Sequence, residues 1–473
     1  MIKNHLVQQI KENFPYQPTL EQEKVIKSLS EFLFSPKNET VFLLKGYAGT
    51  GKTSLFSALV KTLDQLQQKC VLLAPTGRAA KVFASYAGHP AYTIHKKIYR
   101  QKTIAADMGS FSLNDNLSKH TLYIVDEASM ISNQGLSGSA FGSGCLLDDL
   151  VNFVYSGEGC RLMLMGDTAQ LPPVGEDVSP ALYAEALRSY GLQVMEESLT
   201  QVVRQGQESG ILWNATALRQ MIAAGDCYAL PKIRITGFAD ICVLPGNELI
   251  EKLETCYRQD GEDETIVVCR SNKRANIYNK GIRAQILWRE EELESGDRLM
   301  VAKNNYFWTQ HNSQTDFIAN GEMAVVCRVR NERELYGFRF ADVSLLLSDY
   351  ADTEVEATVL LDTLHSEAPA LTKEENERLF NEVLKDYADI TPKSERLKKL
   401  KEDAYYNALQ VKYAYAITCH KAQGGQWKNV FLDQGYMPED SLTPDYFQWL
   451  YTAFTRATGT LYLVNYPKEQ LIL

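Results

Sequence analysis

The sequence predicts an α/β protein built from two successive domains, each formed around a parallel sheet. In the first half of the 473-residue chain, apolar runs alternate with amphipathic helical patterns, as they do in parallel α/β sheets. A glycine-rich turn separates the first apolar run from the helical pattern after it, and the alternation starts again after about residue 237. We therefore expect one domain over residues 1–237 and a second over residues 238–473.

The expected strands and helices follow from the period of the apolar residues. In the first domain the strands lie near 41–45, 70–74, 121–126, 161–166 and 192–199. The helices of this domain lie near 19–34, 53–67, 77–86 and 207–223. The second domain is expected to have strands near 264–269, 412–418, 428–433 and 460–465, with helices near 272–288 and 444–457.

Two segments interrupt this alternation. Residues 97–119 lie between strands and are expected to form a small protruding insertion. Residues 296–411 begin with β-type alternation and continue with a charged helical stretch, in which Thr372 and Glu375 have the spacing of a capping box. We interpret that charged stretch as a solvated helical hairpin without chemistry of its own.

Composition and charge bound the class of protein. The chain is 45% hydrophobic, no apolar run reaches the roughly 20 residues that span a bilayer, and the N-terminus is too polar for a secretory signal. Nine cysteines occur singly, without a CxxC or Cys/His cluster, which argues against disulfides and structural zinc. We expect a reduced, cytoplasmic protein with no membrane partner. The net charge of −10 means that contacts to a nucleic acid would be concentrated in a groove.

The turn in "GYAGTGKT" has the composition and the position of a phosphate-binding loop. It follows an expected strand and opens an expected helix, which is the context that this motif requires. Lys52 would pair with the β- and γ-phosphates, and Thr53 would ligate Mg²⁺. Glycines let backbone N–H groups approach the phosphates at the helix N-terminus. The sequence thus predicts ATP and Mg²⁺ as cofactors, held by Gly46, Gly49, Thr50, Gly51, Lys52 and Thr53.

Two further strands end in residues that suit phosphate chemistry. The run "TLYIVDEASMI" delivers Asp126 and Glu127 at the carboxyl end of a strand, where α/β sheets bind ligands. Asp126 would hold Mg²⁺ through water, and Glu127 would orient or deprotonate the attacking water. In "RLMLMGDTAQLPPVG", Gln170 would sense the γ-phosphate or its water. Asp167 in the same loop is also open to a capping role.

Eight segments taken together resemble the superfamily-one DNA helicases. They run in the order of that family between about residues 15 and 466, as "GYAGTGKT", "APTGRAA", "TIHKKIY", "VDEASMI", "GDTAQLPPVG", "LTQVVRQ", "ITCHKAQGGQW" and "YTAFTRAT". The set is most similar to the RecD-like group, with Dda-type 5′-to-3′ helicases as near relatives. The order and spacing of eight motifs are far more specific than any one of them.

The resemblance implies two RecA-like P-loop motor domains that clamp ATP between them and hold a single strand across their upper face. It implies an ATP hydrolase coupled to 5′-to-3′ DNA unwinding, in DNA repair or recombination. The partners would be single-stranded DNA and duplex junctions, and one chain would suffice as a monomer. Residues 97–119 would carry a strand-separating pin, and residues 296–411 would form a small β-barrel with an added helical segment.

Three polar residues outside the strand ends are further candidates for the ATP site. Arg456 in "FTRA" and Arg204 in "LTQVVRQ" would act as arginine fingers on the developing phosphate charge, although an ion-paired surface position is the ordinary alternative for any arginine. Gln22 lies in "YQPTLEQEKVI", which resembles the segment that reads adenine in this family. The spacing from Thr19 to Gln22 also fits a helix capping box, and both roles are compatible.

DNA contacts are expected in loops at the strand ends, because small hydroxyls, backbone amides and a few cations suit phosphates. The candidates are Thr76, Gly77, Arg78 and His95 in the first domain, and Thr418, His420, Lys421 and Gln423 in the second. Four aromatic residues could stack on bases, with core packing as the alternative: Phe83, Tyr86, Phe111 and Trp427.

The chain also departs from the family pattern. Gly425 and Gln426 stand where the family usually has Ser-Glu, and no carboxylate cluster suited to a nuclease is visible. An RNA helicase or remodeller of the same superfamily is the alternative within the enzyme class, since single-strand grooves tolerate either sugar unless the 2′-hydroxyl is excluded. A nucleotide-switch subunit of a larger complex is the alternative from a different class.

Overall fold

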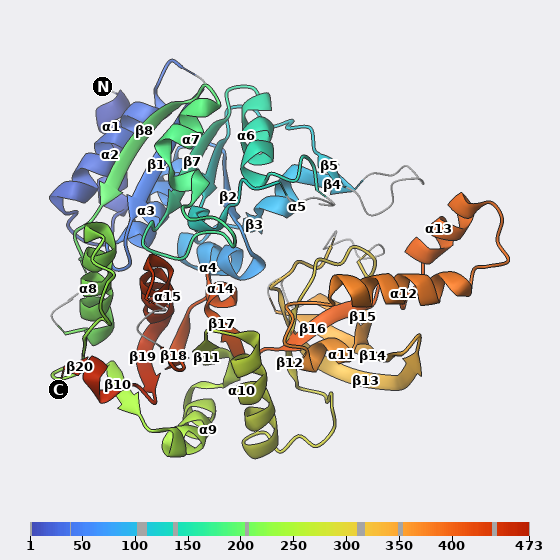
Figure 1. Cartoon of the computed structure of the whole chain (residues 1–473). Coiled ribbons are helices and arrows are strands. Elements are labelled where there is room, and N and C mark those ends of the chain that lie inside the picture. The colour runs from blue at the N-terminus through green and yellow to red at the C-terminus, as the bar shows by residue number, and fades with distance from the viewer. Residues whose placement is uncertain are drawn as a thin grey trace.

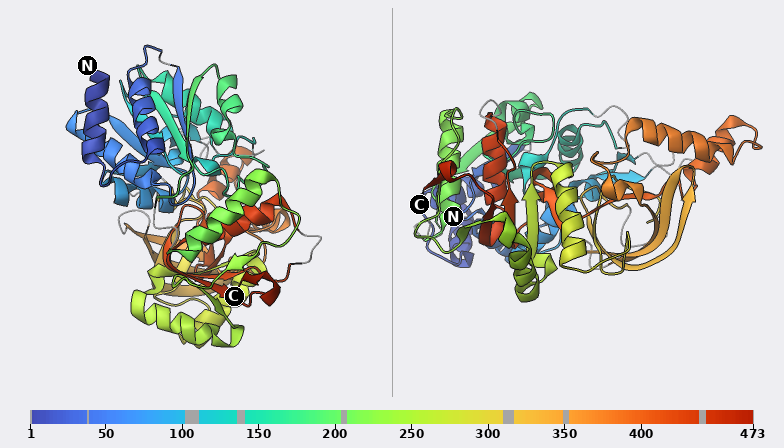
Figure 2. Two further views of the ribbon diagram at one scale, coloured as in Figure 1. Left: turned by 90° about the vertical axis from the view of Figure 1, so that its left-hand side faces the viewer. Right: turned by 60° about the horizontal axis from the view of Figure 1, so that its bottom comes forward.

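The structure is a computed structural model that describes residues 2–37, 39–101, 111–135, 141–203, 208–309, 317–348, 353–437 and 442–472. Two α/β domains lie one above the other, and a small barrel with a projecting helical arm lies to one side of the lower domain (Figure 1). In the right-hand view of Figure 2 the barrel and its arm extend well away from the two sheets. Among the described residues, no helix is both long and apolar enough to cross a membrane.

A six-stranded parallel sheet forms the first domain, with its strands in the order β3, β2, β6, β7, β1 and β8. The strands are β1 (Thr40–Gly46), β2 (Cys70–Ala74), β3 (Ala91–Thr93), β6 (Leu122–Val125), β7 (Arg161–Gly166) and β8 (Gln193–Leu199). The helices are α1 (Ile2–Asn13), α2 (Leu20–Leu33), α3 (Lys52–Gln65), α4 (Gly77–Ala87), α5 (Ile94–Ile98), α6 (Leu146–Ser156) and α7 (Ala184–Ser189).

The central strands of this sheet are buried on both faces. Val41 to Leu44 in β1 are completely buried, as near-continuous apolar strands of a covered parallel sheet are. Because β1, β6 and β7 run parallel, the loops that follow them leave the sheet at one edge. That edge therefore gathers the glycine-rich loop, Asp126 and Asp167.

A five-stranded parallel sheet forms the second domain, in the order β10, β19, β18, β11 and β17. The strands are β10 (Ile241–Leu244), β11 (Thr265–Cys269), β17 (Ala416–Thr418), β18 (Trp427–Asp433) and β19 (Ala457–Val464). The helices are α8 (Gly210–Ala224), α9 (Leu249–Asp260), α10 (Asn272–Gln285), α14 (Cys419–Ala422) and α15 (Pro444–Phe454). A short parallel pair joins β9 (Ile233–Arg234) to β20 (Leu471–Ile472).

Helix α8 packs with the second domain although it precedes residue 237 in the chain. Its buried residues Ile211, Ala215 and Leu218 belong to the apolar cluster that also holds Phe447 and Leu450 of α15. The two helices lie against each other on one side of the molecule in Figure 1. The division of the chain at residue 237 stays a prediction.

The second insertion contains a closed barrel. Its strands are β12 (Arg298–Val301), β13 (Met323–Leu335), β14 (Phe338–Leu347), β15 (Thr353–Leu360) and β16 (Leu409–Tyr413). The arm consists of α12 (Lys373–Lys385) and α13 (Lys393–Lys401), after the short α11 (Asp362–His365). The capping box of Thr372 and Glu375 is present at the start of α12, as predicted. The predicted fold class, two parallel-sheet domains with a small barrel and an added helical segment, is confirmed in these features.

The expected strand over 412–418 was wrong as a single element. It divides into β16, which closes the barrel, and β17, which joins the second sheet. Tyr413 is the last residue of β16 and Ala416 the first of β17, so the chain passes between two sheets within an unbroken apolar run. The pattern of apolar residues indicates which residues are buried, but it does not indicate which strand they pair with. The sequence therefore predicts one strand where the structure has two.

The first insertion begins as a hairpin. β4 (Tyr99–Gln101) and β5 (Phe111–Leu113) pair antiparallel, with Gln101 opposite Phe111. Residues 102–110 lie outside the described residues, so the predicted pin stays a prediction. Phe111 is buried and its ring lies 4.6 Å from that of Tyr306 and 4.9 Å from that of Phe141. The base of the hairpin is therefore packed against the segment that precedes the barrel strand β13.

A buried ion-pair network joins the barrel to the second sheet. Asp297, immediately before β12, is fully buried and accepts hydrogen bonds from Arg283 of α10 at 2.9 and 2.8 Å. The hydroxyl of Tyr415, between β16 and β17, donates to the same carboxylate at 3.0 Å. Every carboxylate oxygen is thus paired, which is the condition under which a buried charge is tolerated.

We expect Asp297→Ala to lower the free energy of unfolding by about 3–5 kcal/mol, because it leaves the buried Arg283 charge without its partner. Denaturant unfolding of the full chain measures the loss. The control is Glu185→Ala, which breaks an exposed 2.9 Å pair with Arg188 and should change the stability little. A similar loss for the two variants would contradict the assignment of this network as the joint.

Candidate functional site

The glycine-rich loop has the backbone geometry of a phosphate-binding loop. Gly51, at the N-terminus of α3, has φ of 81°, in the left-handed region that glycine adopts without strain. The ammonium of Lys52 donates to the carbonyl of Gly46 and, at 2.9 Å, to that of Tyr47. Lys52 is therefore folded over its own loop, where phosphate oxygens would exchange with these carbonyls as partners of the ammonium.

Asp126 leaves the end of β6 two strands away from the loop. One carboxylate oxygen accepts a hydrogen bond from the hydroxyl of Tyr86 on α4, and the other accepts from the amide of Glu127 at 2.8 Å. Burial raises the pKa of Asp126, and the Lys52 charge lowers it in part. The structure thus brings Asp126 and Lys52 within electrostatic range of each other.

Glu127 combines a strained backbone with a raised pKa. Its φ of 51° and ψ of 37° lie in the left-handed region, which a non-glycine residue enters at a cost of roughly 1–2 kcal/mol. Burial raises the pKa of Glu127 to about 6, and nearby Asp126 and Asp167 add to this, whereas Arg456 and Lys52 oppose it. Such strain and such a pKa are concentrated at catalytic sites.

Tyr451 of the second domain reaches into the first domain at this edge. Its hydroxyl accepts a hydrogen bond from the amide of Ala48 in the glycine-rich loop at 3.0 Å, and it donates to Asp167 at 2.5 Å. Asp167 is buried and caps its own loop through the amide of Ala169 at 2.9 Å. One side chain therefore connects α15 to two loops of the first domain.

The loop after β7 is held by the second domain at a further point. The amide of Leu171 donates to the hydroxyl of Thr452 at 2.9 Å, and its carbonyl accepts from the side chain of Gln423 at 2.7 Å. Both bonds are buried. Together with Tyr451, these contacts form what we call the clasp: Tyr451, Thr452 and Gln423 of the second domain on Ala48, Asp167 and Leu171 of the first.

Arg456 lies just beyond α15 and carries a buried charge toward the acidic groups. It is 3% exposed, and within the described part of the chain its guanidinium donates to the neutral oxygens of Thr452, Gly425 and Thr455. Among the described residues no carboxylate forms a salt bridge with it, yet its charge lowers the pKa of both Glu127 and Asp167. Arg456 is thus a buried cation close enough to Glu127 and Asp167 to lower their pKa values. Arg204, the other predicted finger, lies outside the described residues.

Gln170 and Gln22 occupy different surroundings. Gln170 is buried in the loop after β7, and its side-chain oxygen has no hydrogen-bond partner among the described residues. Gln22 forms the capping box with Thr19, and its side-chain nitrogen donates to the carbonyl of Thr50 at 3.0 Å. The capping role is therefore present, and it supports the glycine-rich loop from behind. Contact of Gln22 with adenine stays a prediction.

A cavity of about 390 Å³ adjoins the glycine-rich loop. It lies between the segment after β8 and α8, and its lining includes Val202, Leu212 and Trp213. A Cβ on Gly49 would lie 3.1 Å from Leu212 and 3.3 Å from Val202, which places the loop against the cavity wall. The guanidinium of Arg219 stacks on the Tyr47 ring at 4.2 Å beside it.

The predicted DNA contacts of the first domain lie at the interface with the second. Thr76 caps α4 through the amide of Ala79, and Gly77 is buried as the first residue of that helix. The guanidinium of Arg78 lies 4.2 Å above the ring of Trp427 and donates to the carbonyl of Gln426.

His95 differs from the other first-domain candidates. Its ring packs beside those of Tyr99 and Phe141, and burial lowers its pKa to about 4. The imidazole is therefore neutral at pH 7 and offers no charge to a phosphate.

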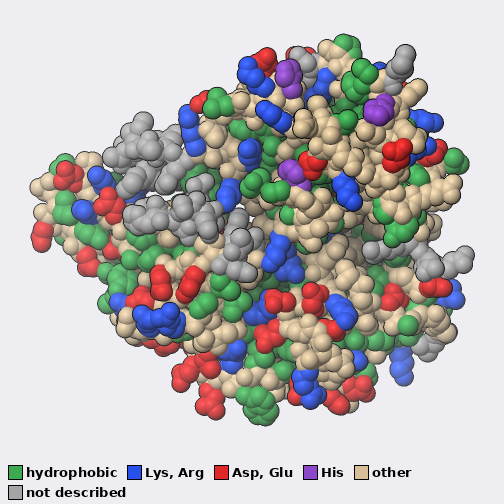
Figure 3. Space-filling model, turned by 180° about the vertical axis from the view of Figure 1, so that it is seen from behind, with side chains coloured by type: hydrophobic (Ala, Val, Ile, Leu, Met, Phe, Trp, Pro, Cys, Tyr) green, Lys and Arg blue, Asp and Glu red, His purple; other side chains and the backbone are tan. Residues whose placement is uncertain are grey.

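The predicted DNA contacts of the second domain are more open, with one exception. Thr418 precedes α14, His420 is exposed, and Lys421 donates to Asn320 at 2.5 Å. Gln423 is the exception, because it is buried in the clasp. Seen from behind, the surface is hollowed between the two domains, with Lys and Arg side chains around the hollow (Figure 3).

The four aromatic residues considered for base stacking all have structural positions. Phe83 and Phe111 are buried in apolar clusters, and Trp427 is buried beneath Arg78. Tyr86 uses its hydroxyl on Asp126. These positions agree with the core-packing alternative. Sequence reasoning did not identify Tyr86 and Tyr451 as residues that donate hydrogen bonds to the acidic groups Asp126 and Asp167. "YTAFTRAT" does begin at Tyr451, but its pattern carries no sign of the partner loops.

The departure at Gly425 has a steric reason. A Cβ at this position would lie 2.5 Å from the Trp427 ring and 2.8 Å from the Arg78 guanidinium. A Cβ on the preceding Gly424 would lie 2.7 Å from Ala79. The glycine pair thus allows the two domains to approach where the serine of the family pattern would collide.

The donor chemistry of the site fits Mg²⁺. Asp126, Glu127 and Asp167 are three acidic groups whose pKa values burial raises, and the cations that oppose this shift are Lys52 and Arg456. The surplus of carboxylate oxygens suits a hard divalent cation. Thr53, which follows Lys52 at the start of α3, adds a hydroxyl.

Two family models match the chain. Residues 21–232 match the AAA domain, and residues 413–464 match the UvrD-like helicase C-terminal domain. The first match contains the glycine-rich loop and both acidic strand ends. The second contains α15 and Arg456.

Three relatives match most of the chain. An uncharacterised protein of Acanthamoeba polyphaga mimivirus is 22% identical over 93% of this chain and 98% of its own length. The ATP-dependent RecD2 DNA helicase of Deinococcus radiodurans is 26% identical over 88% of this chain, which spans 45% of that protein. The ATP-dependent DNA helicase Pif1 of Campylobacter jejuni is 22% identical over 92% of this chain and 90% of its own length.

Solved structures are similar at a lower level. A structure of two coordinating Pif1 helicases at forked duplex DNA matches 97% of this chain and 95% of its own, with 16% identity and a TM-score of 0.49.

We expect Tyr451→Phe to lower the free energy of unfolding by about 1–3 kcal/mol, because it leaves a buried Asp167 oxygen and the Ala48 amide without their shared partner. Tyr466→Phe is the matched control, since this buried tyrosine of the same domain has a hydroxyl with no partner among the described residues. Denaturant unfolding measures both variants. Equal stability of the two variants would show that the clasp hydroxyl contributes nothing.

Proposed function

We propose that this superfamily-one helicase of the RecD and Pif1 group moves 5′-to-3′ along single-stranded DNA and unwinds duplex at junctions. Membership of the group rests on the helicase motifs, on both family models and on the RecD2 and Pif1 relatives. The chain is an ATP-driven DNA helicase. We infer its direction, and a role in DNA repair or recombination, from the resemblance to 5′-to-3′ enzymes.

The observation that carries the proposal is the clasp together with Arg456. Two-domain motors need a nucleotide site that both domains share, because only then does ATP change their relative position. Tyr451 lies near the end of α15 and Arg456 lies two residues beyond that helix, and they bring the second domain to the glycine-rich loop and to Glu127. A nucleotide-switch subunit needs no such cation, so its presence favours a hydrolase.

The residues of the site divide the chemistry of hydrolysis among themselves. Lys52 would exchange its loop carbonyls for the β- and γ-phosphates, and Glu127 would orient the attacking water and take its proton. Arg456 would offset the charge that develops on the transferred phosphate, with Gln170 near the same group. Thr53 and Asp126 would hold Mg²⁺, which neutralises phosphate charge when it is bound. The cavity beside Gly49 is where we place the nucleoside of ATP.

The ATP cycle would be coupled to DNA binding through the segment that contains Gln423, whose side chain donates a hydrogen bond to Leu171. Gln423 of the clasp is followed by Gly424 and Gly425, which pack against Thr76, Ala79 and Arg78. A change in the distance between the domains during the ATP cycle would therefore reach α14, where His420 is exposed and Lys421 is partly exposed. Small hydroxyls and cations there would hold phosphates without reading sequence.

The test is ATP hydrolysis with and without single-stranded DNA, followed by unwinding of 5′- and 3′-tailed duplexes. We expect DNA to stimulate hydrolysis and only the 5′-tailed duplex to be unwound. Glu127→Gln should lower the stimulated rate by roughly 10²–10⁴-fold, the contribution of a general base. Unwinding of the 3′-tailed duplex alone would overturn the direction, stronger stimulation by RNA would favour the RNA enzyme, and binding without turnover would favour the switch subunit.

The pH dependence of hydrolysis should report Glu127. Because burial raises its pKa to about 6, the proton-accepting carboxylate is present above that pH and is lost as the pH falls through it. We expect kcat/KM for ATP to fall about tenfold per pH unit below about pH 6. Glu127→Asp should move this limb to lower pH, since the ordinary pKa of Asp is lower. A limb that stays in place would belong to ATP itself or to another group.

A further inference from the structure

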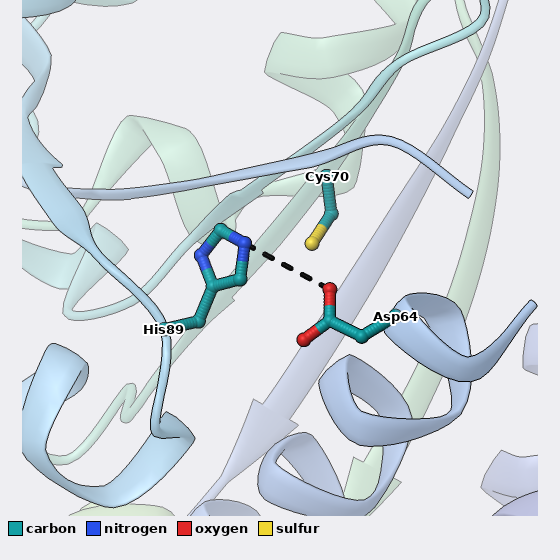
Figure 4. A group of neighbouring side chains, drawn as sticks. All are labelled: Asp64, Cys70 and His89. Carbon is teal, nitrogen blue, oxygen red and sulfur yellow. Dashed lines mark ion pairs between the residues drawn. The ribbon is translucent and has the colours of Figure 1, made fainter. Parts of the chain in front are cut away.

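Three potential metal ligands meet at the edge of the first sheet opposite the ATP site. Asp64 lies near the end of α3, Cys70 is the first residue of β2, and His89 follows α4. One carboxylate oxygen, the thiol sulfur and one imidazole nitrogen all lie within 4.8 Å of one another. Figure 4 shows the three side chains converging from different elements.

We propose that Asp64, Cys70 and His89 bind one transition-metal ion of the Zn²⁺ class. A thiolate, an imidazole and a carboxylate are the ligands that zinc uses in proteins, at about 2.0–2.3 Å from the metal. Tetrahedral geometry at those bond lengths separates neighbouring ligand atoms by about 3.3–3.8 Å. Closure of the cluster therefore needs shifts of about an ångström, which the 51% exposed Asp64 side chain can make.

The backbone on either side pre-arranges the ligands. Gln67 adopts a left-handed φ of 53°, and its amide donates to the carbonyl of Asp64 at 3.0 Å, which turns the chain back so that Cys70 lies beside α3. Gly88 has φ of 66° and ends α4, which brings His89 to the same place. Two tight turns thus deliver ligands that are 6 and 19 residues apart in the sequence.

The orientation of His89 is that of a metal ligand with an outer-shell partner. Its Nδ1 lies 3.1 Å from the carbonyl of Pro90, an atom that can only accept a hydrogen bond. Nδ1 therefore carries the proton in the neutral ring, and the lone pair of Nε2 faces Asp64, whose oxygen is 3.8 Å away. A lone pair and a carboxylate that face each other repel, and a metal cation bound between them, or a proton on Nε2, would remove that repulsion.

Two other roles fit less well. A reactive cysteine needs an electropositive environment, whereas the groups within 4.8 Å of the Cys70 sulfur include the carboxylate of Asp64. A simple ion pair of protonated His89 with Asp64 leaves the position of the Cys70 sulfur unexplained. The cluster is therefore better described as a three-ligand site with a fourth position open to water.

The site would act on the stability of the first domain and not on hydrolysis directly. Asp64 is 12 residues after Lys52 on the same helix, about 18 Å away at 1.5 Å per residue. A bound ion would tie together α3, β2 and α4, whose other ends carry Lys52 and Thr76. Its binding should raise the melting temperature, because an ion that binds only the folded chain stabilises it.

The test is titration of the full chain, freed of metal by a chelator, with Co²⁺ as a spectroscopic probe and Zn²⁺ as competitor. We expect one equivalent of Co²⁺ to give a thiolate-to-metal charge-transfer absorption that Zn²⁺ removes. Cys70→Ser should abolish this absorption. His89→Gln should weaken Zn²⁺ binding at least about tenfold, the loss that even outer-shell changes cause. Cys327→Ser, at a partly exposed cysteine of β13, is the matched control and should change neither.

Two results would overturn the proposal. One is the absence of a thiolate absorption in the wild-type chain. The other is an absorption, or a Zn²⁺-dependent rise in melting temperature, that persists unchanged in both Cys70→Ser and His89→Gln. Melting of each variant without metal shows whether it is folded, and because His89 lies in a surface loop, His89→Gln keeps the test decisive if Cys70→Ser is unstable.

Discussion

The hydroxyl of Tyr451 is the contact on which the arrangement of the two α/β domains depends. It bonds the backbone of the glycine-rich loop and the buried carboxylate of Asp167 at once, so the second domain is attached to the two loops that a nucleotide would touch. Thr452 and Gln423 hold the same edge through Leu171. A change of charge at this edge would therefore reach the second domain directly through hydrogen bonds.

The charged groups near the Tyr451 hydroxyl come from both domains. Burial raises the pKa values of three carboxyl groups, and the cations that moderate them come from different domains, Lys52 from the first and Arg456 from the second. Charge brought by a nucleotide would add to the attraction for both cations. Glu127 adopts a left-handed backbone conformation, the kind of strained position that is concentrated at functional sites.

Much of the fold and of the ATP site could be predicted because it depends on residues close together in the sequence. The strand that ends at Gly46 and the helix that starts at Lys52 have clear apolar periods, and parallel neighbours bring their carboxyl ends to one edge. Prediction failed where two segments with the same period have different partners, as in the division of 412–418 between barrel and sheet. For Trp427 the sequence left base stacking and core packing open, because its burial beneath Arg78 depends on the approach of the two domains.

By itself, the sequence determined the two sheets, the phosphate-binding loop with its acidic partners, and the resemblance to helicases, because local period and motif spacing encode these. Only the tertiary structure decided which side chains meet from distant segments. Tyr451 donates a hydrogen bond to Asp167 across the domain interface. Asp64, Cys70 and His89 lie close together, although their spacing in the sequence matches no metal-site motif. The physical reason is that such contacts depend on the turns and on the packing of whole elements. A left-handed residue at Gln67 and a helix end at Gly88 place side chains that no local pattern connects.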